Sequence, residues 1–193
     1  FGKKENKMGI RASATRELVF QDCRVHKDNL IMGEGRGFIV AMKTLDASRP
    51  SVAAQALGIA TGALEIAIKY SRTRQQFGQP ISANQGLLFL MADMAMKVES
   101  ARALVYRCAD YMDGGAKDVS KLSAMAKCYA SDVAMSVTTD AVQVLGGYGY
   151  MKEYPVEKMM RDAKITQIYE GTNQIQRDVI GKALIKEAAQ GLF

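Results

Sequence analysis

The sequence is poor in the side chains from which metal centres and nucleophile–histidine pairs are built. Its 193 residues include a single histidine, His26, and three widely separated cysteines, Cys23, Cys108 and Cys128. No C-x-x-C pair is present, and one histidine cannot complete a two-histidine zinc site. His26 also lies in a polar stretch with nothing to couple it to a serine or cysteine nucleophile. We therefore expect no metal site, no such triad, and three reduced thiols.

Long apolar runs and a targeting segment are also missing. No apolar run approaches 18 residues and no signal peptide is recognisable, so we expect no membrane association. The chain begins at Phe1 without a methionine, which suggests a fragment of a longer protein.

The positive charge is not gathered into a stripe. The formal net charge is +6, but basic residues are interleaved with acids, as in RDAK at residues 161–164. Nucleic-acid-binding domains concentrate lysine and arginine on one face, so we expect no nucleic-acid partner. A modest attraction for an anionic small molecule fits this charge equally well.

Residues 1–32 differ in pattern from the rest of the chain. Residues 11–15, 17–20 and 23–25 are short stretches rich in β-formers and bounded by polar residues, as strands are. Glycines at positions 33, 35 and 37 then indicate a turn. We expect a few strands before residue 33 and a helical domain over residues 33–193.

From residue 33 onward the apolar periodicity is helical. A first helix is expected to carry apolar residues on one face from Leu45 to Tyr70. A second helix is expected to carry an unbroken apolar seam with steps of four and three residues. A third helix is expected over residues 119–145, with two shorter ones over 156–166 and 173–189. Narrow apolar stripes on long helices joined by short loops predict a four-helix bundle, with the methionines as core. The seam consists of Leu87, Met91, Met94, Val98, Ala101, Val105, Cys108 and Met112, and the buried side of the third helix of Leu122, Ala126, Tyr129, Val133 and Val137.

Two interruptions stand out in this helical region. Pro50 should kink the first helix or begin a new segment capped by Ser48. The glycines at 146, 147 and 149 should end the third helix and allow close approach of a ligand or another chain. An ordinary kink and an ordinary helix end explain the two features equally well.

The most informative carboxylate is Glu170, on a short loop between the last two helices. Thr172 or Asn173 can cap the final helix, with Gln176 as a capping-box partner. A carboxylate between two helix ends, beside Gly171, is well placed to point into a cleft. By itself this pattern also fits a solvated loop residue.

A set of motifs, in one order and spacing over essentially all of the chain, resembles the acyl-CoA dehydrogenase family. Since they occur together, the resemblance is specific. The motifs are KMGIRAS at 7–13, LDASRP at 45–50, RQQFG at 74–78, ADM at 92–94, QVLGGYGY at 143–150, YPVEK at 154–158, RDAK at 161–164 and IYEGT at 168–172.

The resemblance implies a role for each matching residue. Glu170 matches the catalytic base of short- and medium-chain members, and Gly171 the neighbour that lines the acyl-CoA site. Asp46 and Arg49 lie where the family lines the substrate channel. Residues matching FAD contacts from the same subunit are Thr172, Asn173 and Gln174, and those matching contacts to the FAD of a neighbouring subunit are Arg74, Phe77, Gln85, Gln143, Gly146 and Gly147.

The residue at position 48 indicates which branch of the family the chain resembles. Members acting on isovaleryl-type or long-chain substrates carry their base there, and Ser48 cannot be that base. The glutamate at 170 also argues against the nitroalkane oxidase relatives, which use aspartate. The chain is thus similar to the butyryl and medium-chain branch. His26, where many members have proline, leaves the acyl preference open.

The resemblance also implies the setting of the chemistry. Residues 1–32 are what is left of the middle β-domain, and residues 33–193 form the C-terminal helical bundle domain. A base takes the α proton of the thioester, and a flavin accepts the β hydride because no protein side chain can. Electron transfer flavoprotein, a homotetramer or dimer of dimers, and a cytoplasmic or mitochondrial-matrix location are further expectations. The rival interpretation is a non-catalytic helical interaction module derived from such an enzyme.

We predict that the 193-residue chain alone binds FAD weakly and shows no turnover, because most of the family's flavin-ring site lies in domains outside it. Absorbance spectroscopy of the purified chain, with an acyl-CoA oxidation assay, measures both. A near-stoichiometric flavin spectrum contradicts the prediction.

Overall fold

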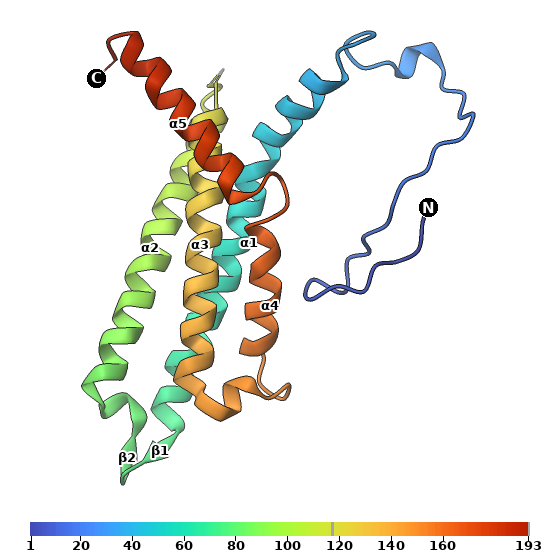
Figure 1. Cartoon of the computed structure of the whole chain (residues 1–193). Helices are drawn as coiled ribbons and strands as arrows, with labels where there is room; N and C mark the ends of the chain where they lie inside the picture. The colour runs from blue at the N-terminus through green and yellow to red at the C-terminus, as the bar shows by residue number, and fades with distance from the viewer. Residues whose placement is uncertain (117, 193) are drawn as a thin grey trace.

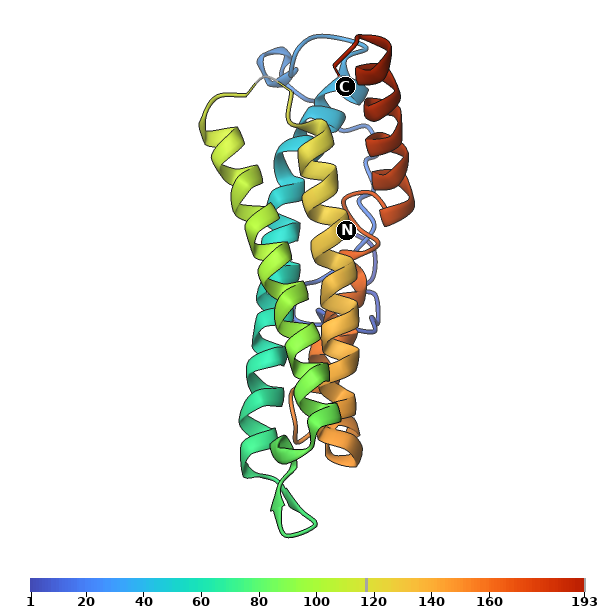
Figure 2. The same cartoon turned by 90° about the vertical axis from the view of Figure 1, so that its left-hand side faces the viewer.

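The computed structural model describes residues 1–116 and 118–192, in which four helices run down, up, down and up in a bundle (Figure 1). The predicted mainly α, four-helix-bundle fold is confirmed. A fifth helix, α5, leaves the bundle beside α3 (Figure 2). The helices are α1 (Gly37–Thr73), α2 (Gln85–Asp113), α3 (Ser120–Leu145), α4 (Val156–Thr166) and α5 (Asn173–Ala189), with short 3-10 turns at Lys27–Asn29, Ile81–Ala83 and Gly146–Tyr150.

The core combines the predicted α2 seam with an unusual number of alanines. Six seam residues from Met91 to Cys108 are buried, and Leu87 and Met112 pack partly buried against them. Because helix separation depends on the side chains at the contact, alanines allow α1 and α3 to pack closely. The alanines without exposed surface are Ala53, Ala56, Ala60, Ala63 and Ala67 on α1, and Ala124, Ala126, Ala130, Ala134 and Ala141 on α3.

The prediction for α3 needs one correction. Its expected apolar stripe included Tyr129, but Tyr129 is 40% exposed while Lys127 is fully buried. A tyrosine can keep its hydroxyl in water at little cost, whereas a buried ammonium requires acceptors inside the protein. The presence of a buried lysine therefore indicates a polar site within the bundle.

Of the two outcomes expected at Pro50, a new helical segment capped by Ser48 does not form, and the kink stays a prediction. α1 is one helix of 37 residues that includes Pro50, and Ser48 is not a helix cap. Proline removes one backbone hydrogen bond, but its neighbours Arg49 and Val52 are buried and hold the helix by tertiary packing.

By length and composition alone, α1 is also the one helix in the described residues that could cross a membrane. Its buried apolar residues between Ala53 and Ala67 lie in the bundle core, where α1 packs against α2, α3 and α4, while Phe38 near its start is exposed. This is the composition of a central core helix.

The strands expected before residue 33 are not formed. Two backbone hydrogen bonds, Gly2 N to Glu17 O at 2.9 Å and Glu5 N to Thr15 O at 3.0 Å, pair the arms of this segment. Residues 11–32 are exposed, including the β-forming stretch 17–20. An isolated pair of extended arms is marginal in water without further strands or a packed face. The division of the chain at residue 32 stays a prediction.

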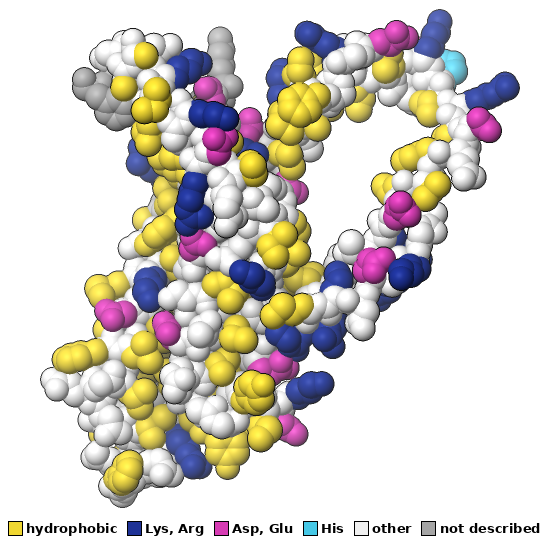
Figure 3. Space-filling model, in the orientation of Figure 1, with side chains coloured by type: hydrophobic (Ala, Val, Ile, Leu, Met, Phe, Trp, Pro, Cys, Tyr) yellow, Lys and Arg dark blue, Asp and Glu magenta, His cyan; other side chains and the backbone are white. Residues whose placement is uncertain are grey.

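The N-terminal segment is attached to the bundle through α4. The Ile10 N–H donates to Asp162 Oδ1 at 2.6 Å, and the Arg161 guanidinium donates to the Met8 carbonyl at 2.7 Å. Residues beyond this attachment arch away from the bundle before entering α1 (Figures 1 and 3). On the face shown in Figure 3, basic and acidic side chains are interspersed, as the sequence indicates.

A small hairpin connects α1 with α2. Strands β1 (Gln75–Gln76) and β2 (Gln79–Pro80) pair antiparallel. The turn residues Phe77 and Gly78 have φ values of 53° and 78°, as in a type I′ turn. Phe77 is 94% exposed at the tip. A bulky residue in this strained conformation, projecting into solvent, is typical of a contact residue.

The C-terminal end of α3 lies where the sequence predicts it. Gly146 follows the last helical residue, Leu145, so the predicted helix end is confirmed.

Enlarging an alanine in the α1–α3 core should destabilise the protein. Ala60→Leu is expected to lower the free energy of unfolding by about 1–3 kcal/mol, because Ala60 has no exposed surface and the core cannot admit three more carbons without strain. Urea unfolding measures the change. Ala54→Leu, on the exposed side of the same helix, is the control and should change stability by less than about 0.5 kcal/mol.

Candidate functional site

Glu170 lies on a left-handed turn between α4 and α5. Its φ is 58° and that of Gly171 is 87°. The left-handed conformation costs a side-chain-bearing residue roughly 1–2 kcal/mol. At Gly171 a Cβ atom would also lie 2.7 Å from Gln176 Nε2, so a larger residue there would displace the Gln176 amide from the turn. The turn leaves the Glu170 side chain half-buried and directed toward α1.

The carboxylate of Glu170 is held by α1. Ser48 Oγ donates to Glu170 Oε2 at 2.5 Å. The next residue, Arg49, is 4% exposed, pairs with Asp46 at 2.7 Å and directs its Nε toward the Glu170 carbonyl at 3.4 Å. The residues expected on the substrate side, Asp46, Arg49 and Gly171, therefore gather around Glu170. Asp46 and Arg49 are three positions apart, so helical geometry places both on this side of α1.

Behind the turn lies a buried cation. Lys127 on α3 has no exposed surface, and its Nζ donates to Gly171 O and to Asn173 Oδ1, both at 2.8 Å. Burial lowers the pKa of Lys127 from its ordinary value of 10.5 to about 8, with Arg49 adding to the effect. The ammonium thus fixes the carbonyl side of the turn that carries Glu170.

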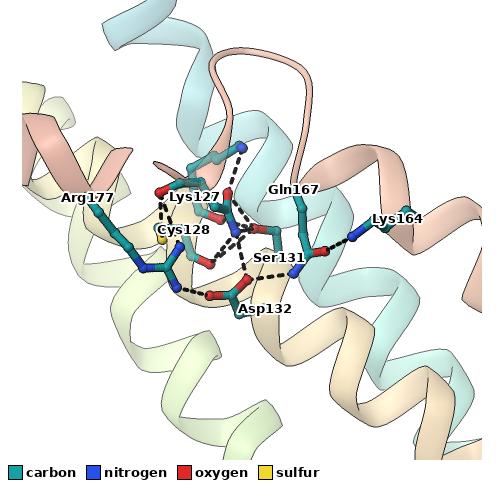
Figure 4. A network of polar contacts seen from close by, with 8 residues as sticks. Lys127, Cys128, Ser131, Asp132, Lys164, Gln167 and Arg177 are labelled. Carbon is teal, nitrogen blue, oxygen red and sulfur yellow. Dashed lines mark hydrogen bonds and ion pairs between the residues drawn. The ribbon is translucent and has the colours of Figure 1, made fainter. Parts of the chain in front are cut away.

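A polar network extends from this lysine toward the surface (Figure 4). Asn173 Nδ2 donates to Ser131 Oγ and to Asp132 Oδ1, both at 2.8 Å. Asp132 also accepts hydrogen bonds of 2.6 Å from Gln167 Nε2 and from Arg177 Nη2. The network ties both ends of the 167–173 loop to α3. A satisfied buried network of this kind specifies one conformation of the loop.

The three residues predicted to contact FAD from the same subunit have different environments. Thr172 is the N-cap of α5, accepting from the Ile175 N–H at 3.4 Å, which confirms one of the two expected caps. Gln174 is exposed. Asn173 is 3% exposed and its amide is engaged in the network, so this side chain faces the interior in the structure.

Gln176 does not act as the expected capping-box partner. Its Nε2 donates to Glu170 O at 3.1 Å and to Gly171 O at 3.0 Å. Gln176 has no exposed surface. Gln176 on α5 and Lys127 on α3 therefore both donate hydrogen bonds to the backbone of the same turn.

A second candidate region lies beside the hairpin, where a groove of about 630 Å³ opens. The Arg74 guanidinium carbon lies 5.2 Å from the centre of the Tyr148 ring, a cation–π contact. No carboxylate in residues 1–116 and 118–192 forms a salt bridge with Arg74. The groove can therefore receive an anionic group. The predicted cofactor residues that line it are Arg74, Phe77, Gln143, Gly146 and Gly147.

The structure separates the predicted residues into two groups. Gln85 begins α2, exposed and near the hairpin but outside the groove lining. The hairpin and the α4–α5 loop lie at different levels of the bundle (Figure 1). One group of predicted residues thus surrounds Glu170 and the other surrounds the groove.

The remaining polar candidates form no further site. Within the described ranges, no three histidine, cysteine, aspartate or glutamate side chains are grouped as metal ligands. The thiols are free, with Cys23 exposed and Cys108 and Cys128 buried.

The sequence analysis missed Ser48 as the partner of Glu170, and it missed Lys127 and Gln176. A signal existed for Lys127, because a lysine adjoining Ala126 interrupts an apolar helix face. No local signal exists for the Ser48 contact, since it joins residues 122 positions apart.

Comparison with known proteins gives consistent matches. Residues 35–185 match the family model described as the acyl-CoA dehydrogenase C-terminal domain. The probable acyl-CoA dehydrogenase FadE25 of Mycobacterium tuberculosis is 56% identical over 185 residues, which are 96% of this chain and 48% of that protein. The chain thus spans about half the length of the curated relatives it matches.

Two solved structures are similar over most of the chain. Butyryl-CoA dehydrogenase from Megasphaera elsdenii aligns with a TM-score of 0.93 and 56% identity, over 95% of this chain and 48% of that one. A chain from the structure of the electron transferring flavoprotein of Acidaminococcus fermentans aligns with a TM-score of 0.93 and 61% identity, over the same shares.

The buried position of Lys127 predicts a pH dependence of stability. Its pKa is about 8 in the folded protein and close to 10.5 in an unfolded chain. Between these values the unfolded chain binds more protons, so stability rises with pH. Relative to Lys127→Met, the free energy of unfolding should rise by up to roughly 3 kcal/mol across this window. Urea unfolding of both proteins at several pH values tests this. A difference that stays constant with pH contradicts it.

Proposed function

Since the chain belongs to the acyl-CoA dehydrogenase family, we propose that it supplies the base and part of the flavin site of an FAD-dependent enzyme. The reaction is α,β-dehydrogenation of a short- or medium-chain acyl-CoA thioester. The observation that carries this proposal is the placement of Glu170: a half-buried carboxylate on a strained turn, fixed by Ser48 and flanked by the buried Arg49.

Glu170 removes the α proton of the thioester. The electron pair of that C–H bond becomes the Cα=Cβ double bond, and the β hydrogen leaves with its own electron pair as hydride. Bound FAD supplies the hydride acceptor. The Ser48 hydrogen bond holds Oε2, and Oε1 accepts no hydrogen bond within the described residues, so Oε1 is the oxygen that takes the proton. A base fixed in this way contributes about 10²- to 10⁴-fold to the rate.

The backbone of Glu170 has a second part in this proposal. Among the described residues its N–H meets no hydrogen-bond acceptor. A free N–H beside the base can donate to the thioester carbonyl, on which negative charge develops as the α proton leaves. The left-handed φ of 58° is what exposes this N–H and the carboxylate from one residue.

The groove beside the hairpin fits the anionic part of FAD. Arg74 offers a guanidinium that forms no salt bridge within residues 1–116 and 118–192 and can bind pyrophosphate oxygens with two parallel hydrogen bonds. Gln143, Gly146 and Gly147 offer an amide and close backbone approach, and Phe77 an exposed aromatic face.

The separation of this groove from Glu170 supports an assembly. If both regions bind FAD, one flavin is held near Glu170, Thr172 and Gln174, and the groove serves the FAD of a neighbouring subunit. The exposed tip at Phe77 supports the same interpretation, because it projects away from its own bundle. We propose a homotetramer or dimer of dimers on this basis.

The relatives support proposals for the acyl preference and the electron acceptor. Similarity to a butyryl-CoA dehydrogenase supports a short-chain substrate. Similarity to a chain from an electron transferring flavoprotein structure supports that flavoprotein as the acceptor. Assaying a panel of acyl-CoA thioesters of different length and branching measures the preference directly.

The rival proposal is a non-catalytic helical module for oligomerisation. Such a module keeps the bundle seam but has no need of a base or of the groove residues. Glu170, Arg74 and Gln143 are all present, and Ser48 contacts Glu170. These features favour the enzyme.

The decisive variant is Glu170→Gln in the full-length, FAD-loaded protein. Acyl-CoA oxidation and bleaching of the flavin absorbance should fall at least about 100-fold, because an amide cannot accept the α proton, while FAD stays bound. Glu65→Gln, exposed on α1, is the control and should retain full activity. Unchanged activity of Glu170→Gln favours the rival proposal or another base.

A further inference from the structure

We propose that Lys127 and Gln176 are positioning residues that hold the Glu170–Gly171 turn in the conformation from which Glu170 acts as base. This inference rests on the proposed function of Glu170. The two side chains act on the backbone of the turn, from α3 and α5, and neither contacts the carboxylate.

The turn needs holding because its backbone is strained. Glu170 and Gly171 are consecutive left-handed residues, with φ of 58° and 87°. Glutamate in this region costs roughly 1–2 kcal/mol and persists only where the surroundings enforce it. Without external contacts, a relaxed turn would redirect the carboxylate and the N–H of Glu170.

The contacts that enforce it converge on two carbonyl groups. Gln176 Nε2 donates to Glu170 O and Gly171 O at 3.1 and 3.0 Å, and Lys127 Nζ donates to Gly171 O at 2.8 Å. Arg49 Nε approaches Glu170 O at 3.4 Å. Both carbonyls therefore point into the bundle and are met by donors from three helices.

The amide of Gln176 is oriented for this purpose at a cost. Its Oε1 is buried with no hydrogen-bond partner in the described part of the chain. An unsatisfied buried oxygen costs about 1–3 kcal/mol. Turning the amide over would place Oε1 against the two carbonyl oxygens of the turn, which repel it. In the observed orientation Nε2 donates to the turn, and Oε1 is left without a partner in the described residues.

Lys127 is likewise more costly than a structural role requires. Its ammonium is fully buried, and its two acceptors, Gly171 O and Asn173 Oδ1, are neutral. No described carboxylate lies within ion-pair distance of it. Burying a charge against neutral acceptors is expensive, and the lowered pKa of about 8 reflects that cost. An apolar residue of similar length, such as methionine, fills such a position in a helical core more cheaply.

The test uses Lys127→Met and Gln176→Met, separately, in the full-length FAD-loaded enzyme. For each we expect kcat to fall about 10- to 100-fold, since displacing a catalytic group by about 1 Å has an effect of this size. KM and flavin content should stay within about twofold, because neither side chain is placed at substrate or FAD. With α-deuterated substrate the isotope effect on kcat should increase, because proton abstraction becomes slower.

Matched controls separate positioning from general destabilisation. Lys182→Met and Gln190→Leu, both at exposed positions of the C-terminal segment, should keep wild-type kcat. If Lys127→Met does not fold, Gln176→Met decides alone, because it leaves the ammonium in place. Folded variants whose kcat stays within about twofold of wild type overturn the inference, as does a loss of activity explained by lost flavin.

The same experiment includes Glu170→Gln. Activity retained by Glu170→Gln refutes the proposed role of Glu170 as the base, on which this inference rests. Loss of activity in Glu170→Gln, together with wild-type kcat in both positioning variants, refutes this inference alone.

Discussion

Two carbonyl groups, those of Glu170 and Gly171, point into the bundle, and the rest of the site depends on the donors that meet them. A peptide carbonyl buried without a partner is costly, so the turn can exist only where such donors are in place. Lys127 and Gln176 satisfy this requirement from α3 and α5. With the carbonyls fixed in this way, the Glu170 carboxylate accepts from Ser48 on α1, and the Glu170 N–H has no acceptor among the described residues.

The bundle provides the geometry that this turn requires. The alanine-rich contact allows α1 and α3 to lie close, so that Ser48 on one helix and Lys127 on the other reach opposite sides of the same turn. The polar network from Asn173 to Asp132 then holds the start of α5 against α3. A tightly packed apolar core and a satisfied polar cluster thus have complementary roles: the first sets helix distances, and the second selects one loop conformation.

The position of the groove extends this argument beyond one chain. Arg74, Phe77 and the glycines after α3 occupy one end of the bundle, away from Glu170. A helical bundle is rigid along its length, so these two regions cannot approach each other within one subunit. In the proposed symmetric assembly, one subunit's groove would lie beside another subunit's turn, and each ligand site would contain residues from two chains.

The sequence by itself determined the bounds of α3, α4 and α5 to within a residue, the α2 seam, the end of α3 at Gly146 and the loop position of Glu170, because these follow from local periodicity and glycine placement. It also carried the motifs that indicate the family. Only the tertiary structure decided that Ser48 meets Glu170, that Lys127 rather than Tyr129 is buried, and that α1 continues through its proline. These outcomes depend on how distant helices are aligned, which no local pattern contains. The expected strands before residue 33 were wrong for the same reason, since a strand forms only beside its partners.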